Sequence, residues 1–574
     1  MGFYLSPIVD VNEVDISTTI PAVATSIGAI ILRDTYKGPE RKTTLTTNID
    51  ELISTFGEPT SAANCYQDIM SAVGFLKYGN KLYCTRTMPP SATFSGTKAP
   101  SGDTSTFVAY TTDIAYKLSD FDSEDPDEFA DEVTVTTQAM WFIASSRGAW
   151  GNNVRIGVMD YTTYNAIASG GHSDWDTYSD FSDIDSPIDD ETGFVVIVST
   201  KEQSATAYTV KESFNVSTDQ NAKDDEGISK YCETVINGKS EYIRMALNAS
   251  YIGEDITIST SSYQSFAGGQ NSDSVLDIVT DGQIQLDLDL YSNAEEIDIN
   301  IFIDSNKSLT IKQYIAEICK TTRKDCMGIL DCPRADVINN KGSETTDLRT
   351  YVLSTLNENN SYVALYGNWL EVYDKWNSRY RWIPASGYVG GVFANTDDVT
   401  DPWFAPAGLN RAVLGNVRRL AWNPTLGNRD ILYKNGVNPI VSFAGQGKVI
   451  WGQKTLLDKS SAFNRINVRR LFLILEKAIS TACKYFLFEP NDELTRLLMV
   501  NMIEPFLRDV RSRRGLYEYL VVCDKTNNTP ERVDRNELWC DIYLKPTRAA
   551  EFIVLNFIAT KTSVSFSEIQ SASA

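Results

Sequence analysis

The chain has 574 residues, of which 42% are hydrophobic, 52 are Lys or Arg and 75 are Asp or Glu. This length and apolar content indicate several globular domains and exclude a disordered chain, and no window approaches the ~18 apolar residues of a membrane span. The net charge of −23 argues against nucleic acid as a main partner, because phosphate binding needs a basic surface.

The first twenty residues alternate apolar and polar side chains and predict an extended strand with no hairpin partner beside it. Its apolar positions are Ile8, Val9, Val11, Val14 and Ile16. Because a lone strand is unstable in water, we expect it to pair elsewhere. Acidic residues precede Arg33, the first basic residue, which is the opposite of a signal peptide; we expect the chain to stay where it is made.

A strand–helix–helix–strand rhythm follows this arm and predicts an α/β layer. We expect a buried strand at 22–32, a helix ending at Phe56-Gly57, a helix at 61–78 and a strand at 81–88. From residue 89 the character changes to Pro, Ser and Thr, and residues 120–132 hold eight acidic side chains in thirteen. We interpret 89–140 as an exposed, β-type insertion; the Asp- and Tyr-rich stretch 169–191 is a second polar region.

Further along, the pattern predicts strands at 194–199, 284–290 and 297–303, and helices at 222–236 and 309–321. Strand–helix alternation returns from 326 to 439. The last part predicts helices at 459–483 and 491–513 and strands at 517–524, 538–544 and 551–559. Residues 562–569 alternate again, with Val564, Phe566 and Ile569 on one side. Both ends of the chain therefore carry strands without an obvious partner.

These patterns predict an α/β and α+β multidomain fold with mixed sheets and helices, a β-rich inserted outer domain and extended terminal strands. The expected domains are an arm at 1–20, a core at 21–88 and 326–439, the insertion at 89–140, a middle α+β domain at 141–325 and a C-terminal domain at 440–574.

Charge is unevenly distributed along the chain. From Ile440 onward there are 19 basic and 15 acidic residues, a balance of +4, so the rest carries −27. Within this basic part, Arg508, Arg511, Arg513 and Arg514 cluster at the expected end of a helix. Cations there offset the helix dipole, which accounts for one or two of them. An acidic docking partner explains the whole cluster equally well.

Catalytic and metal sites find little support in the sequence. The single histidine, His172, lies in the Asp-rich stretch, and a Ser–His–Asp triad or a His-ligated zinc site would have to use it. The nine cysteines never occur as C-x-x-C, and Cys319, Cys326 and Cys332 match no zinc spacing, so we interpret them as small buried residues. The acidic runs lack the order of a calcium loop, so we interpret them as solvated surface. We expect no enzymatic activity and no cofactor.

The stretch from Gly447 to Thr455 looks like a phosphate-binding loop with one residue too many between glycine and lysine. Trp451 in its middle is an awkward neighbour for a phosphate. We therefore prefer a turn relieved by glycine that packs Trp451 into a core, and keep a nucleotide site centred on Lys454 as an alternative.

Several separated segments resemble, in sequence and order, the contractile tail sheath proteins of myovirus-type phages. They are Ser6–Glu13 with Ile20–Ile27, Phe56-Gly57 with Phe75–Tyr83, Ala149–Arg155, Glu212–Phe214 with 222–236, Pro384–Asp397 with Pro402–Pro406, and Asn438–Leu456 leading into Phe463–Arg470. Residues 89–139 and 169–191 match no part of the family that we can assign.

The resemblance implies a structural subunit that polymerises around a tail tube as stacked hexameric rings and contracts to drive the tube through a host envelope. In this family the terminal strands pair with a sheet on neighbouring subunits, which gives a partner to both ends of this chain. The implied partners are further copies of the chain, the tube protein facing the arginine cluster, and baseplate and tail terminator proteins, without nucleic acid or membrane insertion. The implied location is the virion tail, assembled in the host cytoplasm. An alternative from another class is a carbohydrate-binding or depolymerising virion protein, suggested by the Tyr- and Asp-rich loops.

Overall fold

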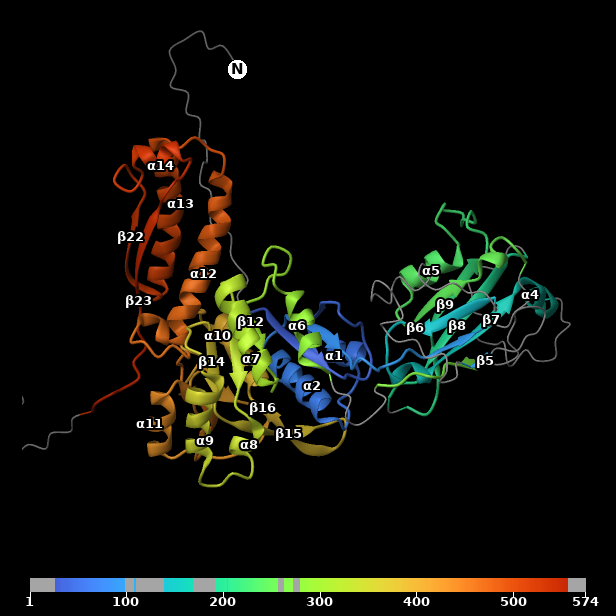
Figure 1. Ribbon diagram of the computed structural model, residues 1–574, viewed down its shortest axis with the longest axis horizontal. Coiled ribbons are helices and arrows are strands. Elements are labelled where there is room, and N and C mark those ends of the chain that lie inside the picture. Colours follow the sequence, from blue (N-terminus) through green and yellow to red (C-terminus); the bar gives the residue numbers. More distant parts are fainter. Residues whose placement is uncertain are drawn as a thin grey trace, which may run out of the picture. The chain divides into compact units, whose positions relative to one another are not determined.

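The structure, a computed structural model, describes residues 26–98, 108–109, 139–168, 191–203, 205–255, 263–271 and 279–555 (Figure 1). The described chain divides between Lys484 and Tyr485 into two compact units. The predicted arm at 1–20, the segment 562–569, His172 and nearly all of 99–138 and 169–190 lie outside the described residues.

A seven-stranded sheet is the centre of the first unit. Its strand order is β19-β14-β13-β12-β1-β3-β2, and every neighbouring pair is parallel except β2 and β3. Its strands are β1 (Gly28–Arg33), β2 (Thr44–Thr46), β3 (Leu82–Thr87), β12 (Ile301–Ile303), β13 (Met327–Asp331), β14 (Val363–Tyr366) and β19 (Val437–Asn438). A largely parallel sheet has both faces covered, so its strands are apolar on both sides.

The side chains of β1 show this two-sided burial directly. Ile30 and Leu32 join a core with α2 (Ala63–Leu76) and α10 (Ser386–Val399). Ala29 and Ile31, which point to the opposite face, join a second core with α6 (Asp281–Asp289), α7 (Leu309–Glu317) and α9 (Glu344–Thr350). The first unit is therefore an α/β layer structure with helices on both faces of its sheet.

Two smaller antiparallel sheets belong to the same unit. The first has the order β16-β15-β18 and consists of β15 (Trp369–Asp374), β16 (Arg379–Pro384) and β18 (Val417–Leu420). The second has the order β17-β21-β20 and consists of β17 (Val413–Leu414), β20 (Ile440–Phe443) and β21 (Gly447–Ile450). Helices α1 (Ile49–Phe56), α8 (Arg334–Val337), α11 (Leu426–Lys434) and α12 (Ile466–Cys483) complete this part.

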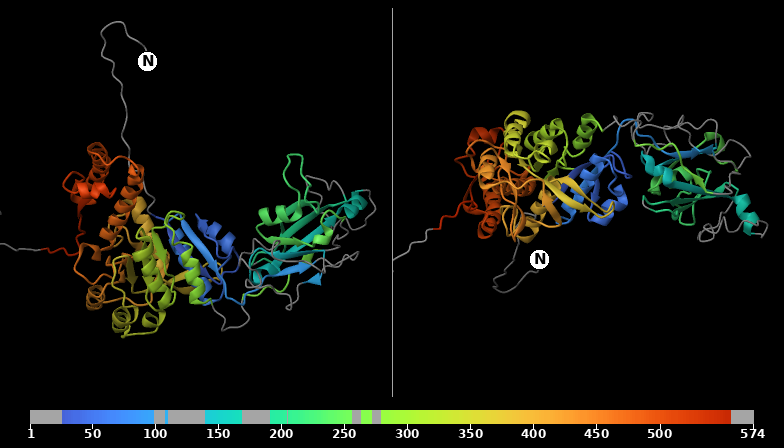
Figure 2. Two further views of the ribbon diagram at one scale, coloured as in Figure 1. Left: turned by 45° about the horizontal axis from the view of Figure 1, so that its top comes forward. Right: turned by 90° about the horizontal axis from the view of Figure 1, so that it is seen from below.

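Between Ser91 and Asn271 the described chain is mainly β structure with its own core (green to cyan in Figure 2). One sheet has the strand order β10-β6-β4-β5, and the other has the order β11-β7-β8-β9. The strands are β4 (Gly96–Lys98), β5 (Val108–Ala109), β6 (Met140–Ala144), β7 (Val154–Asp160), β8 (Gly193–Thr200), β9 (Thr209–Ser217), β10 (Ile243–Leu247) and β11 (Gln264–Ser265), with helices α4 (Tyr161–Ala168) and α5 (Cys232–Lys239). The predicted α/β and α+β multidomain class is confirmed.

The strand predicted at 284–290 is wrong, because residues 284–289 form most of helix α6 and Leu290 is its C-cap. The hydroxyl of Thr280 accepts a hydrogen bond from the N–H of Gln283, and the Gln283 side chain accepts one from the N–H of Thr280. This reciprocal capping starts a helix, whose buried positions Ile284, Asp287 and Leu288 have helical spacing. The alternating Ile, Leu and Asp residues had suggested a strand, but the cap decides the structure.

The predicted helix at 222–236 is wrong for residues 222–231, since α5 begins only at Cys232. The carboxylate of Asp224 accepts hydrogen bonds from the N–H groups of Glu226 and Ile228, and Gly227 has φ = 85°. An aspartate that binds nearby backbone N–H groups favours a turn over a helix.

Other predicted element boundaries also differ from those in the structure. The predicted strand 297–303 pairs only as β12, the helix predicted from 459 begins at Ile466, and the described part of the predicted strand 551–559 forms no strand. No helix among the described residues is long and apolar enough to cross a membrane.

Candidate functional site

The second unit, residues 485–555, packs two strands against a long helix. It consists of α13 (Glu493–Ser512), β22 (Leu516–Val522), α14 (Pro530–Asp534) and β23 (Asp541–Pro546). Asp492 caps α13 by accepting from the N–H of Thr495. The helix, predicted at 491–513, and the two strands, predicted at 517–524 and 538–544, are confirmed with shifted ends.

Strands β22 and β23 form an antiparallel ribbon with one face on α13. Tyr519 pairs with Leu544 on that face, and its hydroxyl donates to the carbonyl of Glu504 in the helix. On the opposite face Leu520 and Tyr543 lie across from each other, and they are 58% and 60% exposed. Two large apolar side chains are thus paired on a surface that water reaches.

The edges of this ribbon have no third strand among the described residues, where β22 and β23 pair only with each other. A two-stranded ribbon is marginally stable alone, and a sheet edge offers unpaired N–H and C=O groups to another strand. The predicted unpaired strands, with Ile8, Val9, Val11, Val14 and Ile16 at one end and Val564, Phe566 and Ile569 at the other, lie outside the described residues. Sequence patterns had located both strands of the ribbon but could not show that they form a sheet of only two.

The predicted arginine cluster lies at the end of α13, and all four side chains are exposed. Arg511 is in the last turn of the helix, and Arg513 forms an exposed ion pair with Asp509 at 3.7 Å. The helix ends because Arg514 adopts φ = 68° and the N–H of Gly515 donates to the carbonyl of Val510. Arg508, Arg511, Arg513 and Arg514 therefore present positive charge to solvent within two helical turns.

The loop from Gly447 to Thr455 is not built as a phosphate cradle, because several of its backbone donors are already used. The N–H groups of Ile450, Trp451 and Lys454 donate to the Ala412 and Pro439 carbonyls and to the Asn438 side chain. The Lys454 ammonium lies 4.7 Å from the centre of the Tyr433 ring.

The expectation that this turn packs Trp451 into a core is wrong. Trp451 is 42% exposed and stacks edge to face on Phe443, with ring centres 4.8 Å apart. The strand-end residues Val449 and Ile450 fill the core instead. The prediction that the turn needs a glycine for steric reasons is confirmed at Gly452, where a Cβ would lie 2.8 Å from the Asn438 side-chain oxygen.

The cysteines behave as packing residues. All nine are free, and Cys319, Cys326 and Cys332 are buried, which confirms their interpretation as small buried residues. Burial raises the pKa of the Cys319 thiol well above its usual value, as it does for Cys332. Among the described residues no group of three His, Cys, Asp or Glu side chains is placed to hold a metal ion.

A buried polar network that the sequence did not reveal joins the carboxyl ends of β1, β12 and β13. Asp68 accepts hydrogen bonds from the Arg33 guanidinium at 2.7 and 2.8 Å and from the Lys307 ammonium at 2.9 Å. Asp331 accepts from the N–H of Ser386 at 2.8 Å, while Asp304 lies beside Lys312 at 3.4 Å. Burial first, and the neighbouring Asp304 second, raise the pKa of Asp331 to about 7.

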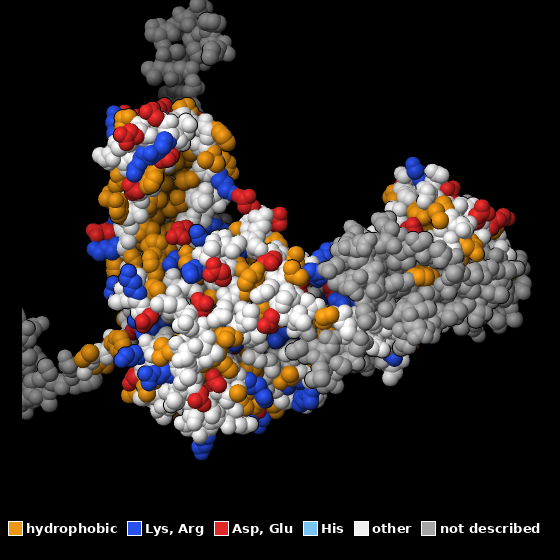
Figure 3. Space-filling view, in the orientation of Figure 1, with side chains coloured by type: hydrophobic (Ala, Val, Ile, Leu, Met, Phe, Trp, Pro, Cys, Tyr) orange, Lys and Arg blue, Asp and Glu red, His pale blue; other side chains and the backbone are white. Residues whose placement is uncertain are grey.

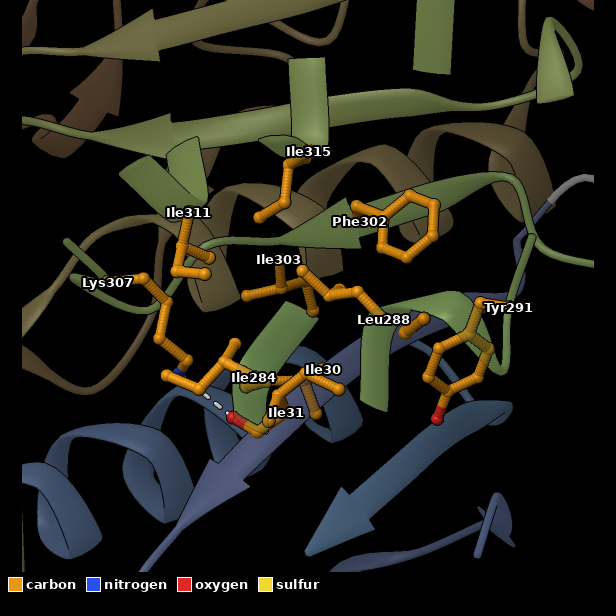
Figure 4. Close-up of a pocket in the computed structure, with 11 residues that line it drawn as sticks. Ile30, Ile31, Ile284, Leu288, Tyr291, Phe302, Ile303, Lys307, Ile311 and Ile315 are labelled. Atoms are coloured by element: carbon orange, nitrogen blue, oxygen red, sulfur yellow. Dashed lines mark hydrogen bonds between the residues drawn. The ribbon is translucent and has the colours of Figure 1, made fainter. Parts of the chain in front are cut away.

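This end of the sheet is filled by its own side chains. The cavity beside it measures about 10 Å³, lies among Ile31, Ile284, Phe302 and their apolar neighbours, and is drawn in Figure 4. Lys307 lines one side of it and donates to the carbonyl of Ile31 at 2.9 Å. Ligands of open α/β sheets bind at the carboxyl ends of strands, and here that position is occupied by a network of internal ion pairs.

A second buried network joins the sheet to the β-rich region. Glu40 binds the guanidinium of Arg147 at 2.7 Å and that of Arg86 at 3.2 Å, and all three side chains are at most 3% exposed. Burial alone would raise the pKa of Glu40, but Arg147 and Arg86 hold it below its usual value. Nearby, a cavity of about 310 Å³ opens between Tyr36, Trp150 and Trp376. Pairs of this kind are costly to break because a lone buried charge remains.

Two family models match this chain in adjacent stretches. The phage tail sheath protein central domain covers residues 288–456, and the phage tail sheath C-terminal domain covers 458–560. The second match contains α13, β22 and β23, together with the arginine cluster.

Individual relatives agree with these matches. The tail sheath protein of Vibrio phage KVP40 is 37% identical over 380 residues, 63% of this chain and 55% of that protein. The tail sheath protein of Enterobacteria phage T4 is 36% identical over 306 residues, 51% of this chain and 46% of that protein. The chain thus spans about half the length of the curated relatives it matches.

A solved structure shares the fold. The superposition with the sheath tail protein of Listeria innocua includes 92% of this chain and 96% of that protein. Its TM-score is 0.52, and the two sequences are 12% identical. The two adjacent domain matches and the two phage relatives agree: residues 288–456 and 458–560 match the central and C-terminal domains of phage tail sheath proteins, and the chain is similar to the tail sheath proteins of two phages.

Proposed function

We propose that this protein is a structural subunit of a contractile tail sheath, which polymerises around a tail tube as stacked hexameric rings and contracts to drive the tube through a host envelope. The observation that carries the proposal is the β22–β23 ribbon, which has open edges among the described residues. The sequence supplies two alternating segments, 8–16 and 564–569, as strands that neighbouring copies donate to such edges.

Strand addition is a suitable linkage for a moving lattice. Each main-chain hydrogen bond contributes about 0.5–1.5 kcal/mol net, and the bonds do not depend on rigid matching of side chains. Subunit bodies can therefore rotate and slide while the linkage persists. Head-to-tail contacts that do not close build a helical tube, and two alternative packings of the bodies would make it bistable.

The charge of the arginine cluster and the similarity to tail sheath proteins suggest the remaining partners. Arg508, Arg511, Arg513 and Arg514 face the tail tube in this proposal, where exposed guanidiniums would bind carboxylates. Baseplate and tail terminator proteins close the two ends of the sheath. The protein acts in the virion tail after assembly in the host cytoplasm, without catalysis, cofactor, nucleic acid or membrane insertion.

The first test is negative-stain electron microscopy of the concentrated full chain beside versions lacking residues 1–20 or 556–574. We expect long striated tubes from the full chain and soluble, folded monomers from each shortened chain. Tubes formed equally by the shortened chains would disprove the strand linkage, and circular dichroism verifies that each version is folded.

The alternative of a carbohydrate-binding or depolymerising protein rests on the Tyr- and Asp-rich stretches, which lie mostly outside the described residues. Such a protein would form a compact closed oligomer, often a trimer, in the same microscopy.

A further inference from the structure

The β16-β15-β18 sheet has one buried and one exposed face, and the exposed face is chemically distinctive. Leu370, Val372 and Ile383 of its inner face belong to the core with α2. On the outer face Tyr373 and Tyr380 are 48% and 49% exposed and lie directly across from each other in β15 and β16. Their rings meet edge to face with centres 5.2 Å apart.

Two arginines of β18 extend this aromatic row. The Arg418 guanidinium lies 4.1 Å from the centre of the Tyr380 ring, and that of Arg419 lies 5.2 Å from the centre of the Trp382 ring. Their side chains are 55% and 62% exposed. Guanidiniums stacked on rings keep their charge accessible while losing conformational freedom.

A single buried carboxylate orients both arginines. Glu371, whose side chain is 7% exposed, accepts two hydrogen bonds from Arg419 at 2.7 and 2.9 Å and lies 3.5 Å from Arg418. Exposed Lys375 lies on the turn that follows β15. One carboxylate therefore faces two arginines, which leaves this sheet face positive in a chain whose net charge is −23.

We propose that this face, defined by Tyr373, Tyr380, Trp382, Arg418 and Arg419, docks an acidic surface of a second copy of the chain. Charge complementarity selects this partner, because residues 1–439 carry a balance of −27 and a lattice of identical chains brings such surfaces together. Aromatic and arginine side chains are enriched in the energetically important parts of interfaces, and preorganised ones lose less entropy on binding. Figure 3 shows basic side chains over β15 and β16. The inference rests on the proposed self-assembly of the chain.

The test compares tube assembly by full-length variants, measured by pelleting across protein and salt concentrations. R418Q/R419Q removes both charges, and E371Q/R418Q/R419Q also removes the carboxylate that would otherwise be left buried without a partner. The control R334Q/R349Q removes two exposed arginines of α8 and α9. We expect both test variants to need about tenfold more protein for assembly and to lose salt sensitivity, with the control unchanged.

Unchanged assembly of both test variants would overturn the proposal. If the full chain forms no tubes at all, the proposed function fails. The docking face is then tested by crosslinking, which does not require tubes. A concentrated mixture of natural-abundance and nitrogen-15 chains is treated with a zero-length carbodiimide crosslinker. Crosslinks between Lys375 of one isotope and an Asp or Glu of the other support the docking face, and their absence overturns it.

Discussion

Buried acidic residues around β3 and α6 couple the stability of the first unit to pH. Asp287 accepts a hydrogen bond from the hydroxyl of Thr87 and lies 3.8 Å from the Arg41 guanidinium. Burial raises its pKa to about 7, against about 3.9 for an exposed aspartate. Because the folded-state pKa is the higher one, this group favours the folded state at low pH and loses that contribution as pH rises from about 4 to 7.

The substitution Asp287→Asn removes this titration and tests it. The variant should gain stability relative to the original chain between pH 5 and pH 7, on the order of 1.4 kcal/mol per pH unit, because it has no carboxylate to ionise. Urea unfolding at several pH values measures the difference, with exposed Asp225→Asn as the control. A stability difference that does not change with pH would contradict the assignment.

At the scale of elements, helices α2 and α10 of the first unit pack closely against each other. A Cβ on Gly387 would lie 2.1 Å from the carbonyl oxygen of Ser71, and one on Gly74 would lie 2.4 Å from the Tyr388 ring. These glycines let two helix backbones approach over the same core that lies under β1 and β12. Their role is steric, since Gly387 and Gly74 are within helices.

Gly387→Ala should therefore destabilise the chain by about 1–3 kcal/mol or more, since the backbone of α2 must move. Gly427→Ala in α11 is the matched control, because a Cβ there meets nothing within 4 Å and alanine favours a helix by about 1 kcal/mol. Thermal unfolding should show a lower midpoint for the first variant and an equal or higher one for the second. Equal unfolding midpoints for the two variants would refute the close packing of α2 against α10.

Periodicity predicted most of the core elements but failed where local hydrogen bonding decided the structure. Some elements were predictable because their apolar residues follow the pattern typical of a buried strand or of a helix. They are strands β1, β3 and β8 and helices α2, α7 and α13. Helix α6 and the turn at Asp224 were missed because a capping pair and a carboxylate bound to backbone N–H groups override the apolar pattern. The proposed docking face was also missed, since it combines the neighbouring strands β15 and β16 with β18, which is distant from them in sequence.

At the scale of the whole molecule, the proposed linkage combines parts that one chain cannot satisfy alone. The second unit has a ribbon that pairs with no third strand among the described residues, and the sequence predicts further strands at both ends. Polymerisation would unite them, while the acidic balance of residues 1–439 and the basic balance from Ile440 would favour contacts between unlike surfaces. Sequence could suggest the donated strands, but pairing between copies is not encoded in any single-chain pattern.

Cryo-electron microscopy of tubes formed by the full chain tests this account most directly, because it resolves the neighbours of β22 and β23. We predict that strands from adjacent copies, residues 8–16 and 564–569, lie beside the ribbon and enlarge it. A map in which the ribbon remains two-stranded, with subunits joined only through side-chain contacts, would contradict the central claim.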